Sequence, residues 1–120
     1  MKKHQRITST IEFQDIIEKK QYTANQAFVI YIQEKKRENA RVGITVSKKM
    51  GNAVTRNKVK RQVRMMFQDF IKKEFRKDVI CIVRQGYTQN DYEVNKKELE
   101  LLLHKVNIIG DKPIKEKLDD

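Results

Sequence analysis

Basic side chains dominate the middle of this chain. Residues 39–68 include eight Lys or Arg and no Asp or Glu, although the whole chain has 16 acidic residues. Acids and bases are usually interspersed on a protein surface, so a long window of bases alone is typical of a surface that binds a polyanion. The alternative is a solvated charged face, which is what most charge runs are.

Residue patterns for catalysis by the protein itself are weak. The sequence has no Cys-His or His-Asp-Ser pattern, no phosphate-binding Gly-rich loop and no close carboxylate pair suited to magnesium. One cysteine (Cys81) and two distant histidines (His4 and His104) argue against a zinc site. Cys81 lies within an apolar run and is expected in the core. These residues alone predict a nucleic-acid-binding protein without chemistry of its own.

Composition supports that class. The chain has 27 Lys and Arg, a net charge of +11 and 38% hydrophobic residues, a balance that favours nucleic acid or an anionic membrane as partner. No apolar run approaches the length of a membrane span, and no signal peptide is evident. The single cysteine suits a reducing cytoplasm. We expect one domain over residues 1–109 and a flexible tail over residues 110–120.

Hydrophobic periodicity places the first elements. A capping box at residues 9–12 predicts a helix over residues 10–19, in which the Glu12 carboxylate reaches back to the helix start. Period-two alternation predicts strands over residues 27–33 and 41–47, joined as an antiparallel hairpin. Residues 21–24 could add a short edge strand.

The later elements follow from caps and apolar runs. Asn52 is a good N-cap for a long helix over residues 53–73, and residues 78–84 predict a central, buried strand. Asn90 or Asp91 would cap a last helix. The whole order predicts an α+β sandwich, with helices over one face of a small, mainly antiparallel sheet.

The long helix divides into two sides. Its apolar stripe begins at Val59, and polar residues occupy the opposite arc. The charges crowd the first three turns, where the helix dipole disfavours cations by about 0.3–1 kcal/mol each, and a bound anion would offset that cost. Arg56 is expected to project from the helix start. The polar arc comprises Asn57, Lys58, Lys60, Arg61 and Arg64.

Aromatic residues add a second candidate surface. Strand phase places Tyr31 opposite Phe28 and Ile30, so its ring can stack on an unpaired base, which is worth about 1–3 kcal/mol. A Tyr packed under the first helix is an equally weighted alternative. Phe13 could line the same cleft from the helix side.

Residues 43–61, GITVSKKMGNAVTRNKVKR, closely resemble the signature of the bacterial ribonuclease P protein component. The usual form of that signature is R-N-R/K-x-K-R after a G-N-A-V turn. The element around Phe13, residues 24–31 and the strand at residues 79–84 also match in order and spacing. The resemblance covers about residues 6–106.

The resemblance implies an auxiliary subunit of a ribonucleoprotein that removes the 5′ leader from precursor tRNA. In this family the catalyst is an RNA, with Mg²⁺ bound mainly by RNA, and one protein pairs with one RNA. The protein assists substrate recognition and broadens specificity. The implied fold is a ribosomal-protein-like sandwich with a left-handed βαβ crossover.

The resemblance also implies roles for individual residues. Phe13, Val29 and Tyr31 would line a leader-binding cleft, and no metal ligand is assigned in the protein. A ribosomal or general RNA-binding module stays open as an alternative, as does a DNA binder, against which the absence of a helix-turn-helix partner argues. The residues that would face the catalytic RNA are Lys48, Lys49, Arg56, Asn57, Lys58, Lys60, Arg61 and Arg64.

Overall fold

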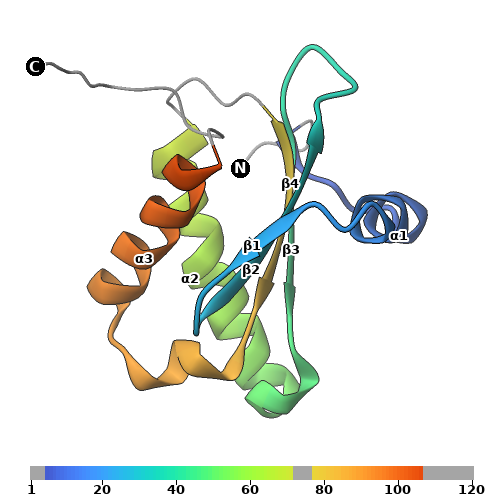
Figure 1. The fold of residues 1–120 in the computed structure, drawn as a ribbon. Helices are drawn as coiled ribbons and strands as arrows, with labels where there is room; N and C mark the ends of the chain where they lie inside the picture. The colour runs from blue at the N-terminus through green and yellow to red at the C-terminus, as the bar shows by residue number, and fades with distance from the viewer. Residues whose placement is uncertain (1–4, 72–76, 107–120) are drawn as a thin grey trace, which may run out of the picture.

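The computed structural model describes residues 5–71 and 77–106 as an α+β fold (Figure 1). α2 and α3 lie on one side of the sheet and α1 on the other. The α+β class is therefore confirmed, with α1 added to the face opposite the two longer helices. The elements in chain order are α1 (Thr10–Glu18), β1 (Tyr22–Ala24), β2 (Phe28–Glu34), β3 (Val42–Val46), η2 (Lys48–Met50), α2 (Ala53–Ile71), β4 (Lys77–Val83), η3 (Gln85–Gln89) and α3 (Tyr92–Lys105).

The sheet has the strand order β1-β2-β4-β3. β4 pairs antiparallel with β2 and parallel with β3, so it occupies the central position that its sequence predicts. The predicted hairpin between residues 27–33 and 41–47 is wrong, because β4 lies between these two strands. The reason is burial: β4 carries the continuous apolar run, which suits a strand covered on both faces. The short edge strand is confirmed as β1, which pairs antiparallel with β2.

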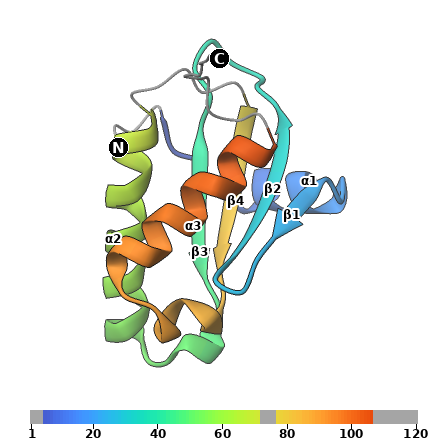
Figure 2. The same cartoon turned by 60° about the vertical axis from the view of Figure 1, so that its left-hand side comes forward.

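The β3–α2–β4 connection has an unusual hand. In Figure 2 the helix side faces the viewer, β3 and β4 both run downward, and β4 lies to the right of β3. Turned so that the strands point upward, the second strand lies to the left, which defines a left-handed crossover. About 98% of parallel connections are right-handed, so this feature is a strong mark of the fold.

The main core lies between the sheet and the helices α2 and α3. The predicted stripe on α2 is buried from Val59 to Phe70, and Leu99, Leu102 and Leu103 are buried on α3. Each such side chain stabilises the fold by about 1.5–3 kcal/mol through burial. The predicted helix end at residue 73 lies outside the described residues.

A second, smaller core holds α1 against the opposite face. This core consists of three buried isoleucines: Ile7 before α1, Ile16 on α1 and Ile80 on β4. The partly buried side chains that pack around them are Phe13, Tyr31 and Ile82. The Ser9 hydroxyl accepts from the Glu12 amide at 3.4 Å, as the capping box predicts. The predicted return contact, from the Glu12 carboxylate to the helix start, is wrong. The carboxylate pairs instead with Arg41, which directly precedes β3. α1 is thus fixed by apolar packing and by one ion pair.

Candidate nucleic-acid interface

The helix α2 begins after a turn that contains a glycine and an N-capping asparagine. Gly51 has φ +133, a conformation that favours glycine. The Asn52 side-chain oxygen accepts from the Thr55 amide at 3.0 Å, which confirms the predicted N-cap. The short helix η2, immediately before this turn, brings Lys48 and Lys49 beside the positive end of the α2 dipole.

The cations of η2 and α2 form what we call the basic surface: Lys48, Lys49, Arg56, Lys58, Lys60, Arg61 and Arg64. Lys58 and Arg61 are exposed, whereas Arg56, Lys60 and Arg64 are half-buried. Within residues 5–71 and 77–106, none of the seven pairs with a carboxylate. Asn57 is exposed on the same helix. The positive charge of this surface is thus left for an external anion.

Two arginines of the basic surface carry unused donors. The Nε atoms of Arg56 and Arg64 are buried and have no hydrogen-bond partner in the described part of the protein. Arg56, which is expected to project from the helix start rather than enter the core, is half-buried. Buried donors are rarely left without an acceptor, and phosphate oxygens are strong acceptors for guanidinium groups. Because the Nε atoms are buried, a phosphate can reach these two side chains only through the outer nitrogens of their guanidinium groups.

A groove of about 670 Å³ runs along the outer edge of β3. α1 contributes Phe13, Gln14 and Ile17 to its wall, and α2 contributes Lys60 and Arg64. The segment before α1 closes one side, where the Ile7 amide donates to the Val42 carbonyl at 2.9 Å. The groove therefore connects the basic surface to α1.

The sheet face under α1 carries the predicted cleft residues. Phe13 lies on Gly43, because a Cβ built at Gly43 would come within 2.6 Å of the Phe13 ring. Phe13 and Tyr31 contact the same small core, and both are half-buried. Val29 is also half-buried, and it pairs across the sheet with Ile82. Val29 and Tyr31 do not line the β3 groove, so the three predicted residues share a sheet face rather than a single pocket.

The packing interpretation of Tyr31 is confirmed, and its stacking on a base stays a prediction. Its ring packs against the small core beneath α1, as the packing alternative predicts. It is only half-buried, so part of the ring is available for stacking.

Period-two alternation over residues 41–47 puts Arg41 on the face opposite Val42 and Ile44, and α1 covers that face. The Arg41 side chain is buried on the α1 face, where its Nη2 lies 2.6 Å from a Glu12 oxygen and 3.6 Å from an Asp78 oxygen. The Arg41 amide donates to Asp78 at 2.9 Å, and Gln33 donates to Asp78 at 3.1 Å. Lys19 of α1 then donates to Gln33 at 2.7 Å. A polar network therefore anchors both ends of α1 to the sheet.

The ionisation of this network follows from its contacts. The hydrogen bond from Arg41 holds the pKa of the Glu12 carboxyl below its ordinary value. The same pair raises the pKa of Arg41, so the ion pair persists at neutral pH. A signal in the sequence was the presence of Asp78 at the start of an apolar strand, since a buried carboxylate requires a partner.

Elsewhere, burial dominates the titratable groups. Cys81 is fully buried, as predicted, and burial raises the pKa of its thiol. Burial also raises the pKa of Tyr87 to about 12, while its hydroxyl donates to Gln62 at 2.8 Å. The described residues contain no cluster of three or more His, Cys, Asp or Glu that could hold a metal ion. No helix in residues 5–71 and 77–106 has the length and apolar character needed to cross a membrane.

Comparison with known proteins settles the family. The family model for ribonuclease P matches residues 1–107. The chain belongs to the ribonuclease P protein family. The ribonuclease P protein component of Mesoplasma florum is 49% identical over 105 residues, covering 86% of this chain and 96% of that protein. The Bacillus pumilus protein of the same name is 38% identical over 117 residues, covering 96% and 98%.

Solved structures of ribonuclease P proteins share the fold. The Staphylococcus aureus protein matches with a TM-score of 0.80 and 37% identity, covering 88% of this chain and 98% of that one. The Thermotoga maritima protein matches with a TM-score of 0.71 and 27% identity, covering 82% and 96%. A ribonuclease P protein is a subunit of a tRNA-processing ribonucleoprotein endonuclease and works with its RNA subunit.

Proposed function

We propose that this protein binds the catalytic RNA of ribonuclease P through the basic surface and the 5′ leader of precursor tRNA through the sheet face beside α1. The hydrolysis of the phosphodiester takes place on the RNA subunit, where Mg²⁺ is held mainly by RNA groups. One protein pairs with one RNA in the cytoplasm. By holding the leader, the protein assists substrate recognition and broadens specificity.

The seven unpaired cations carry the first half of this proposal. They lie on α2 and η2, and within the described residues no carboxylate neutralises them. Arg56, Arg61 and Arg64 add guanidinium groups, which bind phosphate oxygens through several N–H donors. Structured RNA supplies the matching phosphate oxygens in a fixed array.

The sheet face supports the second half. Phe13 and Tyr31 are half-buried aromatic residues around one small core, so each ring is held in place and partly accessible. Held rings suit base stacking, which tolerates different sequences because every base has a π-face. Such tolerance is what a subunit needs if it handles many tRNA leaders. The β3 groove, lined by Lys60, Arg64 and Phe13, connects this face with the basic surface.

The test compares leader-bearing and leaderless tRNA as ligands of the reconstituted holoenzyme. The proposal predicts that adding the protein to catalytic RNA increases affinity for the leader-bearing tRNA much more than for the leaderless one. Tyr31→Ala should reduce this preference and leave assembly with the RNA intact. A general RNA-binding module predicts equal increases for both tRNAs, and that result would reject leader recognition.

A further inference from the structure

Tyr22 forms an aromatic pair with Tyr31 at the edge of the sheet. The two residues are direct cross-strand partners of β1 and β2, and their ring centroids lie 5.2 Å apart with an interplanar angle of 38°. Tyr22 is 58% exposed, whereas Tyr31 is half-buried. Tyr22 is thus the exposed member of the pair, and Tyr31 packs against the small core.

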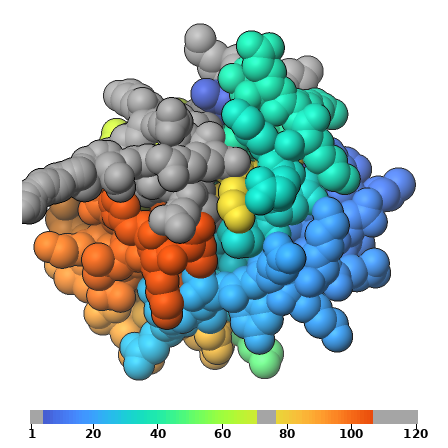
Figure 3. Space-filling view, turned by 45° about the horizontal axis from the view of Figure 1, so that its top comes forward, coloured from blue at the N-terminus to red at the C-terminus, as the bar shows by residue number. Residues whose placement is uncertain are grey.

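The pair extends a row that crosses the whole sheet. Gly43, Ile80, Tyr31 and Tyr22 are successive partners from β3 to β1, and Phe13 lies on Gly43 at the other end. Three strand spacings make this row roughly 14 Å long. A row of this length is long enough for several nucleotides, because each stacked nucleotide adds ~3.4 Å. Figure 3 shows the segment of β1 and the α1–β1 turn at the surface, beside the blue residues of α1.

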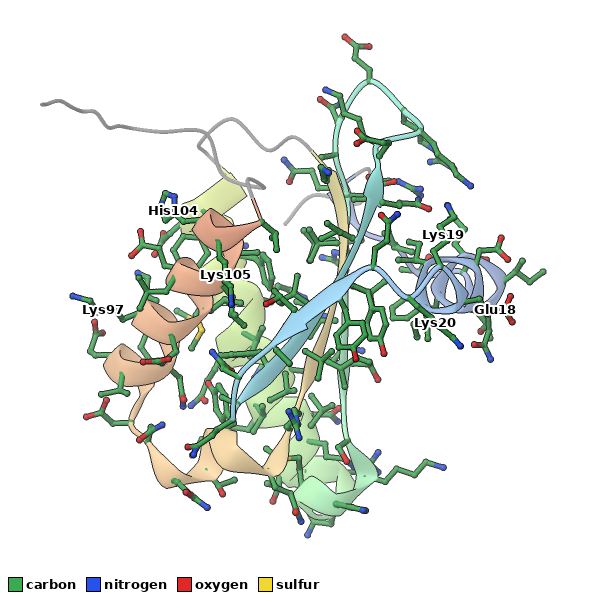
Figure 4. The ribbon with its side chains drawn as sticks, in the orientation of Figure 1. Glu18, Lys19, Lys20, Lys97, His104 and Lys105 are labelled. Atoms are coloured by element: carbon green, nitrogen blue, oxygen red, sulfur yellow. The ribbon has the colours of Figure 1, made fainter. Side chains whose placement is uncertain are left out.

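A basic residue, Lys20, precedes Tyr22 closely in the sequence. Lys20, between α1 and β1, has φ +57 and is the only non-glycine residue with positive φ in the described chain. Glycine takes this conformation with less strain. Lys20 is exposed, and Figure 4 shows it projecting from the end of α1. By contrast, its neighbour Lys19 donates to Gln33. The conformation is a common helix ending, so the relevant feature is the charge: Lys20 pairs with no carboxylate among the described residues.

We propose that Tyr22 and Lys20 extend the leader-binding surface to the β1 edge, where Tyr22 stacks on an unpaired leader base and Lys20 contacts a phosphate. This inference rests on the proposed leader recognition and adds a second contact position to it. Leader nucleotides that reach past Tyr31 would meet Tyr22 next. The contact therefore depends on leader length.

The experiment measures tRNA affinity of the reconstituted holoenzyme over a series of leaders shortened one nucleotide at a time. Tyr22→Ala is expected to weaken binding of the longer leaders about fivefold or more, since stacking on an aromatic side chain is worth ~1–3 kcal/mol per base. Leaderless tRNA should bind as tightly as to the unmodified protein. Tyr22→Phe keeps the ring and should retain most of the affinity for long leaders.

Lys20 is tested with a substitution that relieves the backbone. Lys20→Gly removes the charge and suits the positive φ, so leader affinity should fall and depend less on salt while the fold is retained. Lys20→Arg should keep the affinity. For Tyr22→Ala the matched control is Leu101→Ala, which removes another exposed apolar side chain, 55% exposed on α3.

The outcomes separate this inference from the proposal beneath it. If Tyr31→Ala reduces leader preference and Tyr22→Ala does not, the extended surface is wrong and the leader cleft stands. If neither variant changes leader preference, both ideas fail. If Tyr22→Ala weakens long leaders, short leaders and leaderless tRNA alike, its role is structural and the inference is overturned.

Discussion

Glu12 on α1 accepts two hydrogen bonds from the guanidinium of Arg41, at 2.6 and 3.1 Å. Arg41 precedes β3, so this pair joins the helix to the strand that carries Gly43, the residue on which Phe13 lies. The Glu12–Arg41 pair thus sets where α1 stands over the sheet. The width of the proposed leader cleft depends on that position.

Arg41→Ala should destabilise the fold by about 3 kcal/mol, because it leaves the fully buried Asp78 without its charged partner. Urea unfolding measures the loss. Lys77→Ala is the matched control: it breaks the pair with Glu34, whose side chain is 84% exposed, and such surface pairs contribute less than about 1 kcal/mol. Equal losses in the two variants would show that the buried network does not hold α1.

The same pair predicts a dependence of stability on pH. Arg41 holds the pKa of Glu12 below its ordinary value of 4.5, so the ionised carboxylate stabilises the folded state. This contribution is fully present above pH 4.5 and is lost as pH falls through the lowered pKa of the folded state. Glu12→Gln should be less stable at neutral pH, and its deficit in the free energy of unfolding should shrink as pH falls. A deficit that stays constant with pH would contradict the ion-pair account.

Arg61→Ala or Arg64→Ala should weaken assembly with the catalytic RNA and flatten its salt dependence. Each lost phosphate contact should reduce the slope of log affinity against log salt by roughly 0.7–0.9. Titrations of labelled RNA at several salt concentrations give the slope. Lys97 is exposed on α3 (Figure 4), outside the basic surface, so Lys97→Ala is the matched control and should leave the slope unchanged. A similar change in slope for Lys97→Ala would mean that charge alone, and not the basic surface, drives assembly.

Gly43→Ala should move Phe13 and impair leader binding. The added Cβ would lie 2.6 Å from the Phe13 ring and 2.8 Å from Ile80, so one of these side chains must shift. Overpacking of this kind destabilises by about 1–3 kcal/mol. Thermal unfolding and the leader-bearing to leaderless affinity ratio report the two effects. The double variant Gly43→Ala with Phe13→Leu should regain stability but not leader preference, and a full recovery of preference would show that the Phe13 ring does not contact the leader.

The helices could be predicted well from the sequence because their signals are local. Asn52 and Asp91 cap α2 and α3 with side-chain hydrogen bonds, and the stripe from Val59 to Phe70 faces the core. Each of these features depends on residues within a few positions of one another. The same locality predicts an exposed position for Lys58 and Arg61, as the structure shows.

The sheet order and the buried network could not be predicted, because both depend on distant residues. β2 and β3 are consecutive strands, yet β4 separates them, and only the competition among strands for the central position decides this. Arg41 has the strand phase that was expected, but α1 covers that face and converts an outward position into a buried one. The pairing of Tyr22 with Tyr31 could not be predicted either, because it depends on the register of β1 against β2.

The most direct test of the account is single-turnover cleavage of precursor tRNA by the cognate catalytic RNA at low Mg²⁺, with and without this protein. We predict that the protein increases the cleavage rate for leader-bearing substrate, and that Arg64→Ala and Tyr31→Ala each reduce the increase. Cleavage that is no faster with the protein than without it would contradict the assignment of RNA and leader binding to these two surfaces.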